Sequence, residues 1–365
     1  MKPESRIAIV YSKFGDGHLQ VAQALKQSFE AHGYRNVRLY DLLEETHPRL
    51  NAVSRRFYLK SASYAPRVYG FIYRATNVKP NRLVSRLFHS VGMKRLREEW
   101  ARERPDLVIH TFPLLAADEL RYKLRHDIPT ITVITDYVLH TRWVHRNTSM
   151  YFVGCESLKR SLSAAGVPAS KIAVTGIPLR EAFRQTRSRE ELCRQYKLEA
   201  DRSRILIMAG AYGVQTSVKA IMDTVLANAD SDVIVVCGKN AKLKRSLEAE
   251  YASSSRVTLI GYADHIHELM AMSDCLLTKA GGITLTEAMA MSLPTVVYRP
   301  LPGQERGNAE YLSAMGAVGV AYRIEELALQ LRIALSKDGA GRMKEAMRSL
   351  YRQESVSTIA SRLYR

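Results

Sequence analysis

The chain has 365 residues, of which 46% are hydrophobic, and a formal net charge of +18 from 54 basic and 36 acidic residues. This length and composition predict a two-domain globular protein and exclude a membrane-spanning one, because no apolar run approaches the ~20 residues that a span needs. The four scattered cysteines are typical of a reduced cytosolic protein, and the excess positive charge predicts an anionic partner: an acidic substrate, a nucleic acid or an anionic lipid surface.

Short apolar strands alternate with helical stretches, a pattern that predicts βα units and parallel sheets. We expect the first strand at 7–11 and a helix with one apolar face at 19–32. Further strands are expected at 37–40, 107–110, 131–134, 151–154, 205–208, 233–237, 257–260, 275–278 and 295–298. The expected architecture is therefore α/β, with doubly wound domains at 1–170 and 171–340 and a helical tail at 341–365.

A glycine-containing loop, Phe14 to His18, separates the first strand from the first helix. At this position a helix N-terminus meets a strand end, which favours a bound anion. We expect His18 to face a cleft between the domains and to donate a hydrogen bond to a phosphate or to an acceptor hydroxyl. The alternative is an ordinary loop or capping histidine.

An insertion at 49–104 interleaves aromatic and basic residues and holds fourteen Lys or Arg against three Glu. Basic and aromatic side chains on one amphipathic helix are typical of interfacial membrane binding. Two alternatives remain open: a helix that simply covers the sheet, and RNA binding through stacked bases. The residues assigned to the membrane and the acceptor are Arg55, Arg56, Phe57, Tyr58, Lys60, Tyr69, Phe71 and Tyr73.

Asp136 follows the strand expected at 131–134 and would lie at its carboxyl end. A carboxylate there is suited to act as a general base on an incoming hydroxyl, although aspartate also caps turns. His140 and His145 are five residues apart, which does not place them on one helical face, and no thiolate or carboxylate completes a metal set.

A second glycine turn, Gly281-Gly282, joins the strand expected at 275–278 to a helix. Free N–H groups at a helix start favour a diphosphate, and glycine allows its close approach. Glu287, about one turn further on, is placed to accept hydrogen bonds from ribose hydroxyls. The G-x-G-x-x-G spacing of dinucleotide sites is missing, so a nucleotide sugar fits better than NAD.

The strand expected at 295–298 ends in a polar segment that contains Gln304, Glu305 and Asn308. Ligands of open parallel sheets bind beyond the carboxyl ends of the strands, so we expect these side chains near the same ligand, where they suit hexose hydroxyls. The alternative is a polar loop with a helix cap. Asp230-Ser231-Asp232 matches a D-x-D metal motif but precedes a strand, so we interpret it as a loop and expect no metal.

Together these motifs resemble those of the processive diacylglycerol glucosyltransferases of Gram-positive bacteria. They are also similar to those of the plant monogalactosyldiacylglycerol synthases and, more distantly, of the N-acetylglucosaminyltransferase that makes lipid II. The resemblance implies two Rossmann-like, doubly wound α/β domains facing a cleft, the GT-B glycosyltransferase architecture. The segments that carry it are 14–18, 58–61, 111–113, 135–145, 175–178, 208–213, 236–240, 279–287 and 302–308.

The resemblance also implies roles for particular residues. In the plant enzymes an aspartate matching Asp136 is the proposed base, and a histidine matching His18 is needed. Glu287 would contact the ribose, and Gln304 and Glu305 the sugar, with Asn308 nearby. The residues implied for the diphosphate are Gly210, Ala211, Tyr212, Gly213, Gly281, Gly282, Ile283 and Thr284.

The implied reaction is inverting, metal-independent and processive transfer of glucose from UDP-glucose to the 3-hydroxyl of 1,2-diacylglycerol, giving mono- and oligo-glucosyldiacylglycerol. The implied enzyme is peripheral, at the cytoplasmic face of the cell membrane, with UDP-sugar as substrate and no cofactor. Its implied partners are diacylglycerol, glucosyldiacylglycerol and an anionic membrane surface, without nucleic acid. The rival interpretations are a UDP-galactose-dependent synthase, a lipid II-forming enzyme, and a basic nucleic-acid-binding or regulatory module with a degenerate site.

Overall fold

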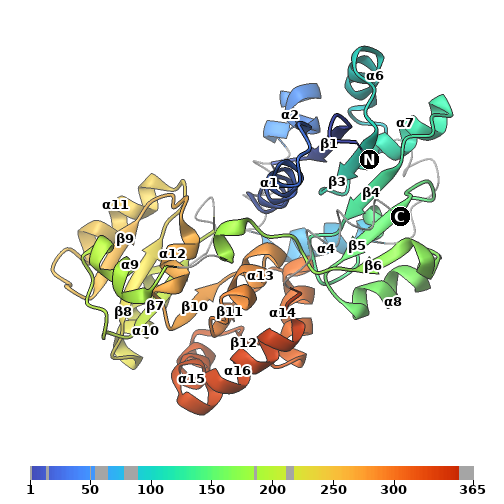
Figure 1. Cartoon of the computed structure of the whole chain (residues 1–365). Helices are drawn as coiled ribbons and strands as arrows, with labels where there is room; N and C mark the ends of the chain where they lie inside the picture. The colour runs from blue at the N-terminus through green and yellow to red at the C-terminus, as the bar shows by residue number, and fades with distance from the viewer. Residues whose placement is uncertain are drawn as a thin grey trace. The chain divides into compact units, whose positions relative to one another are not determined.

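The computed structural model describes residues 2–13, 16–49, 51–53, 65–77, 89–184, 187–210 and 218–352. These residues form two compact units (Figure 1), the first ending at Glu181 and the second comprising Ala182–Tyr351. The division lies after the expected boundary at residue 170, because a strand at Ile172–Val174 joins the first sheet. Residues 341–350 belong to a helix of the second unit and form no separate tail, and 353–365 lie outside the described residues.

The first unit is built on a parallel sheet in the order β2-β1-β3-β4-β5-β6. Every residue of β3 and β4 is buried, as expected where helices cover both faces of a parallel sheet. The strands are β1 (Arg6–Tyr11), β2 (Asn36–Asp41), β3 (Leu107–His110), β4 (Thr130–Val133), β5 (Met150–Val153) and β6 (Ile172–Val174). The direction of winding reverses between β1 and β3, and such switch points are where open α/β sheets bind ligands.

The first helix buries the apolar face predicted from the sequence, with Val21, Ala22, Leu25 and Phe29 inside. It begins at Asp16, inside the segment 14–18 that we expected to be a loop, so His18 lies in its first turn. The described helices of this unit are α1 (Asp16–Ala31), α2 (Leu42–Thr46), α4 (Pro66–Thr76), α6 (Met93–Arg102), α7 (Ala116–Leu124) and α8 (Glu156–Ala164).

The second unit has the sheet order β12-β11-β10-β7-β8-β9, again wholly parallel. Its switch point lies between β7 and β10. The strands are β7 (Arg204–Met208), β8 (Asp232–Val236), β9 (Val257–Ile260), β10 (Cys275–Thr278), β11 (Thr295–Tyr298) and β12 (Val318–Ala321). The described helices are α9 (Arg189–Tyr196), α10 (Val218–Asn228), α11 (Ala241–Glu250), α12 (Ile266–Ala271), α13 (Gly282–Ala290), α14 (Gln304–Ala314), α15 (Ile324–Leu335) and α16 (Lys337–Leu350).

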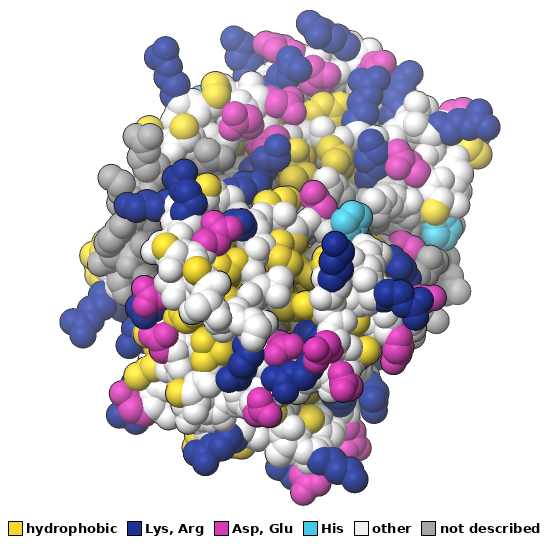
Figure 2. All heavy atoms as spheres, turned by 90° about the vertical axis from the view of Figure 1, so that its left-hand side faces the viewer, with side chains coloured by type: hydrophobic (Ala, Val, Ile, Leu, Met, Phe, Trp, Pro, Cys, Tyr) yellow, Lys and Arg dark blue, Asp and Glu magenta, His cyan; other side chains and the backbone are white. Residues whose placement is uncertain are grey.

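Charge is mixed on the face that Figure 2 presents, where Lys and Arg side chains interleave with Asp and Glu. Pairs such as Lys219–Glu250 at 2.8 Å and Arg306–Glu310 at 2.7 Å show how acidic residues offset part of the net charge. A mixed face of this kind does not focus a field on an anion. In the described part of the chain, no helix is both long and apolar enough to cross a membrane.

Candidate active site

The start of α13 leaves backbone N–H groups open to a ligand. Gly281 is the N-cap, and no side chain caps this end of the helix among the described residues. The N–H of Leu285 is bonded to the Gly281 carbonyl at 3.0 Å, so the N–H groups before it, from Gly282 to Thr284, are those that a helix start leaves without an intrahelical acceptor. Together with the helix dipole they make this turn suited to a diphosphate.

The glycine turn lies at the switch point of the second sheet. Strands β10 and β7 are neighbours, with Leu277 opposite Ile207. Gly210 follows β7 with φ +83°, a left-handed conformation that glycine adopts readily. The two turns therefore leave adjacent strand ends. Ala211, Tyr212 and Gly213 lie outside the described residues.

Helix α14 braces this turn. The buried Asn308 amide donates a hydrogen bond to the Ala280 carbonyl at 3.1 Å. A Glu305 carboxylate oxygen lies 3.9 Å from Lys279 Nζ, and its other oxygen accepts from the Leu301 N–H at 3.0 Å. The structure thus brings these two residues, predicted to bind sugar, to the glycine turn, where Asn308 is bonded to Ala280 and Glu305 lies beside Lys279.

Gln304 and Glu287 complete the predicted donor site. Gln304 is the first residue of α14 and is partly exposed, following Gly303 at φ +109°, where a side chain would be strained. Glu287 lies on α13 and is only 5% exposed. Of the two, Gln304 is the more accessible to a sugar.

In the first unit, His18 is held at the ends of three adjacent strands. Its Nδ1 lies 2.6 Å from the Thr111 carbonyl oxygen, just after β3, and 3.2 Å from Thr135 Oγ1, just after β4. The rings of Phe112 and Trp143 pack around it at centroid distances of 5.0 and 6.3 Å. Phe14 and Gly15 of the preceding loop lie outside the described residues.

These contacts decide the protonation of His18. A carbonyl oxygen only accepts hydrogen bonds, so the proton is on Nδ1 and Nε2 carries the lone pair. Burial lowers the pKa of His18 to about 4, against the opposing effect of its bond to Thr111. A neutral Nε2 at physiological pH accepts a hydrogen bond, whereas the sequence led us to expect a donor.

Asp136 is buried, at 5% exposure, beyond the end of β4. The charge of Asp136 acts on Tyr73 of α4, because burial first and then this charge raise the pKa of the Tyr73 phenol. The Tyr73 ring meets His140 edge-on at 4.7 Å, and Thr141 N–H donates to Asn77 Oδ1 at 2.8 Å. The C-terminal end of α4 is therefore docked onto the loop that follows Asp136.

The rest of α4 is divided between packing and exposure. Tyr69 is partly buried, whereas Phe71 is 67% exposed and is accompanied by Val68 and Ile72 at 49% and 37%. Of the three described residues assigned to the membrane and acceptor, Tyr73 is the one that the charge of Asp136 affects. Arg55, Arg56, Phe57, Tyr58 and Lys60 lie outside the described residues.

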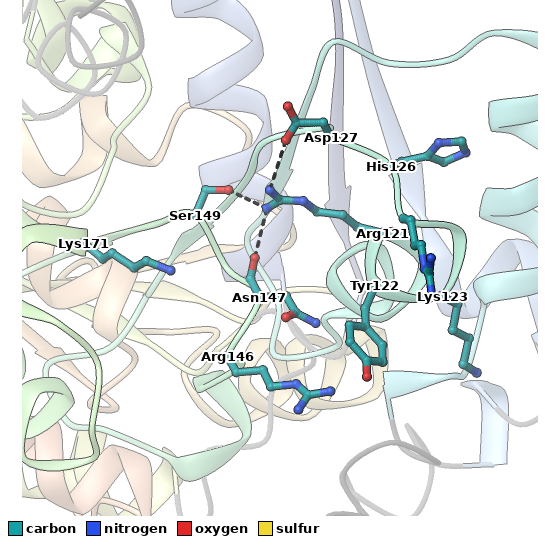
Figure 3. Close-up of a pocket in the computed structure, with 10 residues that line it drawn as sticks. Arg121, Tyr122, Lys123, His126, Asp127, Arg146, Asn147, Ser149 and Lys171 are labelled. Carbon is teal, nitrogen blue, oxygen red and sulfur yellow. Dashed lines mark hydrogen bonds and ion pairs between the residues drawn. The ribbon is translucent and has the colours of Figure 1, made fainter.

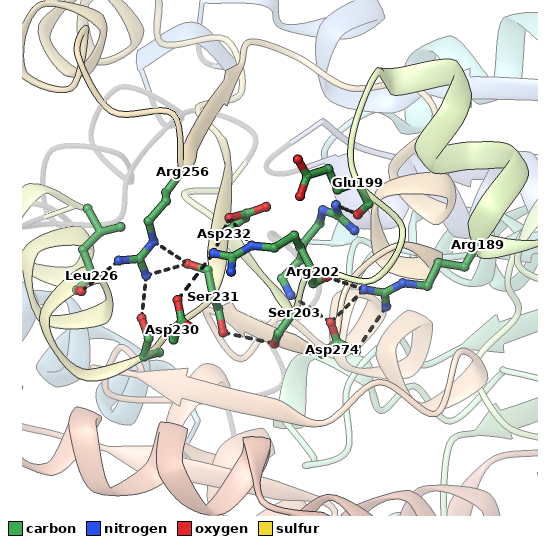
Figure 4. A network of polar contacts seen from close by, with 12 residues as sticks. Arg189, Glu199, Arg202, Ser203, Leu226, Asp230, Ser231, Asp232, Arg256 and Asp274 are labelled. Atoms are coloured by element: carbon green, nitrogen blue, oxygen red, sulfur yellow. Dashed lines mark hydrogen bonds and ion pairs between the residues drawn. The ribbon is translucent and has the colours of Figure 1, made fainter.

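The D-x-D segment has the structural role expected of a loop. Asp232 begins β8, and both Asp232 and Asp230 pair with Arg202, at 3.2 and 3.4 Å (Figure 4). Sequence reasoning missed a different group that could hold a metal ion, at the start of α12: His265, His267 and Glu268 each offer one ligand atom, and these atoms lie within 4.8 Å of one another. Glu268 in that group already accepts a hydrogen bond from the Tyr196 hydroxyl at 2.7 Å.

Two family models match the two halves of the chain. One, described as monogalactosyldiacylglycerol (MGDG) synthase, matches residues 18–179, and one described as glycosyl transferases group 1 matches residues 194–352. The processive diacylglycerol beta-glucosyltransferase of Bacillus licheniformis is 36% identical over 361 residues, which cover 98% of this chain and 94% of that protein. The protein of the same name from Bacillus subtilis strain 168 is 35% identical, with the same coverage of 98% and 94%.

Solved structures confirm the fold. MurG of Acinetobacter baumannii superposes with a TM-score of 0.63 at 14% identity, covering 99% of both chains. UDP-GlcNAc 2-epimerase from Neisseria meningitidis, bound to UDP-GlcNAc, superposes with a TM-score of 0.67 at 15% identity, covering 98% of this chain and 99% of that one. The predicted class, two Rossmann-like, doubly wound α/β domains of the GT-B type, is confirmed.

Proposed function

Because the chain belongs to the family of processive diacylglycerol beta-glucosyltransferases, we propose that it transfers glucose from UDP-glucose to the 3-hydroxyl of 1,2-diacylglycerol, and then again to its product. The observation that carries this proposal is the uncapped, glycine-led start of α13 at the switch point of the second sheet, braced by Asn308. An anion site of this kind suits the diphosphate of a nucleotide sugar.

The second unit supplies the donor half of the reaction. The α13 N–H groups hold the diphosphate and stabilise the charge that develops on it as the bond to the sugar breaks. Lys279, close to the Glu305 carboxylate, adds a cation beside the turn. Glu287 receives the ribose and Gln304 the hexose. This arrangement requires no resident metal, and an assay that is unaffected by a chelator would support that part of the proposal.

The first unit supplies the acceptor half. The lipid hydroxyl oxygen forms the new bond to the anomeric carbon as the bond from that carbon to the diphosphate breaks, and the hydroxyl proton passes to Asp136. That hydroxyl has a single proton, which Asp136 takes, so the neutral Nε2 of His18 accepts a hydrogen bond from another hydroxyl of the substrates and helps to position them. A single displacement inverts the anomeric carbon and yields a β-glycoside.

The acceptor is a membrane lipid, so the enzyme must reach a bilayer surface. The exposed apolar side chains of α4, Val68, Phe71 and Ile72, together with the basic residues of the 49–104 segment, support peripheral attachment to an anionic membrane, which we place at its cytoplasmic face. Because α4 is docked beside Asp136, attachment through this helix would bring the lipid hydroxyl toward the proposed base.

One assay tests the donor and the acceptor together. The purified chain is incubated with anionic vesicles that contain diacylglycerol. Each reaction contains one donor, which is UDP-glucose, UDP-galactose or UDP-N-acetylglucosamine. The lipid products are then analysed by mass spectrometry. A ladder of hexosyl products from UDP-glucose alone supports the proposal. Products from UDP-galactose alone identify a galactosyltransferase, and no glycolipid from any donor, with UDP binding intact, overturns the acceptor assignment. Preferential co-sedimentation with RNA over vesicles would favour a nucleic-acid-binding protein.

A further inference from the structure

The first unit carries a cationic hollow of about 930 Å³ that the proposed reaction does not use. It is formed where segments leading into β4, β5 and β6 meet, at the amino ends of these strands. Thr111 and Asp136 follow strands of the same sheet and mark its opposite, carboxyl edge. The residues that define the cationic hollow are Arg121, Lys123, Arg125, Asn147, Arg146 and Lys171.

Positive charge in the hollow is poorly compensated. Five Lys or Arg side chains line it, against the single carboxylate of Asp127. That carboxylate lies 3.6 Å from Arg121, but its side chain is fully exposed, and water and salt weaken such a pair. For the other four cations the described residues show no ion pair, so the hollow presents a concentrated positive field. This contrasts with the mixed face of Figure 2.

The donors are held in place before any ligand arrives. One Arg121 guanidinium nitrogen donates to the Asn147 carbonyl at 3.0 Å and to Ser149 Oγ at 2.7 Å, which fixes this side chain across two segments (Figure 3). Lys171 Nζ donates to the Thr148 carbonyl at 3.2 Å, leaving its other two N–H bonds available. The Arg146 guanidinium stacks over the Tyr122 ring at 4.4 Å, an arrangement that leaves its in-plane donors free to face an anion.

Asn147 supplies an independent sign of a ligand. Its amide nitrogen is buried, yet it has no hydrogen-bond acceptor among the described residues. A buried donor without an acceptor is costly, and an acceptor bound in the hollow would satisfy it. Guanidinium, ammonium and amide donors from three segments line the hollow, and this set favours an anion with several charged oxygens over a single carboxylate.

We propose that the cationic hollow is a phosphate-binding site, distinct from the donor and acceptor sites, and that it takes a phosphate group borne either by a soluble compound or by a lipid headgroup. The proposal does not depend on which sugar the enzyme transfers, because it rests on Arg121, Arg146, Asn147 and Lys171 alone.

The test compares variants of the full chain. Binding of inorganic pyrophosphate is measured by isothermal titration calorimetry, with UDP at saturation so that the diphosphate turn of α13 is occupied. The variant Arg146→Gln with Lys171→Gln should bind pyrophosphate about tenfold or more weakly, because two charge-assisted contacts are lost. The control, Lys337→Gln with Arg342→Gln, removes one Lys and one Arg from the exposed surface of α16 and should leave affinity unchanged.

Asn147→Asp provides a second variant in case the double substitution does not fold, since the new carboxylate can pair with Arg121 while it repels an anion. Equal affinities in wild type, both variants and the control would overturn the proposal, as would a wild type that binds no pyrophosphate.

Vesicles distinguish the two sources of phosphate. Partition onto phosphatidylcholine vesicles with and without phosphatidic acid is compared for the wild type, the double variant and the control. If the double variant loses both pyrophosphate binding and its preference for phosphatidic acid, the site takes a lipid headgroup. If it loses pyrophosphate binding alone, the ligand is a soluble phosphate compound.

Discussion

At the scale of single residues, Asp136 and His18 have different parts in the proposed chemistry. Asp136→Asn keeps the size of a buried side chain but removes the base. We expect turnover to fall roughly a hundredfold to ten-thousandfold, the usual contribution of a general base. UDP affinity should stay unchanged, because the diphosphate turn belongs to the other unit. Initial rates and calorimetric UDP titration measure the two effects, and near-normal turnover would refute the assignment of the base.

The low pKa of His18 makes a separate prediction about pH. An ordinary histidine titrates near 6.5, whereas burial places the pKa of His18 at about 4. We therefore expect kcat/KM to pass through the region around pH 6.5 without an inflection and to fall only as pH approaches 4. Protonation there removes the lone pair on Nε2. NMR titration of the ring protons assigns the inflection, and a midpoint near 6.5 for His18 would contradict the structure.

At the scale of elements, α14 and α13 act together on the donor. Asn308→Ala removes the hydrogen bond that holds the Ala280 carbonyl and leaves that buried acceptor unsatisfied, at a cost of about 1–3 kcal/mol. We expect the affinity for UDP to fall about tenfold. The matched variant Gln304→Ala, one turn earlier on α14, should weaken UDP-glucose binding and leave UDP binding intact. Calorimetry with both ligands separates these outcomes, and the same loss of UDP affinity in both variants would count against a bracing role.

Helix α4 makes a second prediction at this scale, because one of its faces is exposed and apolar while the other is partly buried. Phe71→Ser removes an exposed apolar side chain without disturbing packing, so vesicle partition should fall several-fold while the melting temperature stays unchanged. Leu329→Ser, on α15 of the second unit and 50% exposed, is the control for a general loss of surface hydrophobicity. Vesicle flotation and thermal unfolding provide the readouts. Equal losses of vesicle partition in the two variants would refute the assignment of α4 to the membrane interface.

Much of this arrangement follows from local sequence. Buried parallel strands consist of continuous apolar runs, so β10 and the glycine turn Gly281–Gly282 between it and α13 were predictable, whereas binding of an anion there stays a prediction. The edge strands β6 and β12 escaped prediction because β6 offers an apolar run of only 3 residues and the 4-residue run of β12 is interrupted by Gly319. The partner of His18 was not predictable either. Thr111 is 93 residues away, and only the placement of β1 beside β3 brings them together.

The cationic hollow shows the same limit more sharply. Arg121, Arg146 and Lys171 lie on separate segments with ordinary local composition, so no sequence motif predicts that they line one hollow. Phe71 and Tyr73, by contrast, belong to one aromatic and basic stretch, and the sequence analysis assigned both residues to the same membrane and acceptor role. The docking of α4 onto His140 distinguishes them, because it leaves Tyr73 partly buried against the loop after Asp136 and Phe71 exposed. Side-chain type was predictable at these positions, and side-chain surroundings were not.

At the scale of the whole molecule, the two units differ in how many histidines they contain. Eight of the ten histidines precede residue 150, and only His265 and His267 belong to the second unit. Burial lowers the pKa of His18 and His140 to about 4 and of His89 to about 3, and it also lowers the pKa of the fully buried His110. The first unit therefore folds around neutral imidazoles.

This asymmetry predicts that the first unit is the more acid-sensitive. In the unfolded chain these histidines bind protons near pH 6.5, above their folded pKa values, so unfolding takes up protons. Their contribution to stability is complete above pH 6.5 and is lost as pH falls toward 4. Asp41 and Glu45, whose pKa values burial raises, bind protons in the folded state and offset part of the loss. Hydrogen exchange, corrected for intrinsic rates, should show β3 and β4 losing protection between these pH values before β7 and β10. Simultaneous loss in both sheets would show that other groups govern acid unfolding.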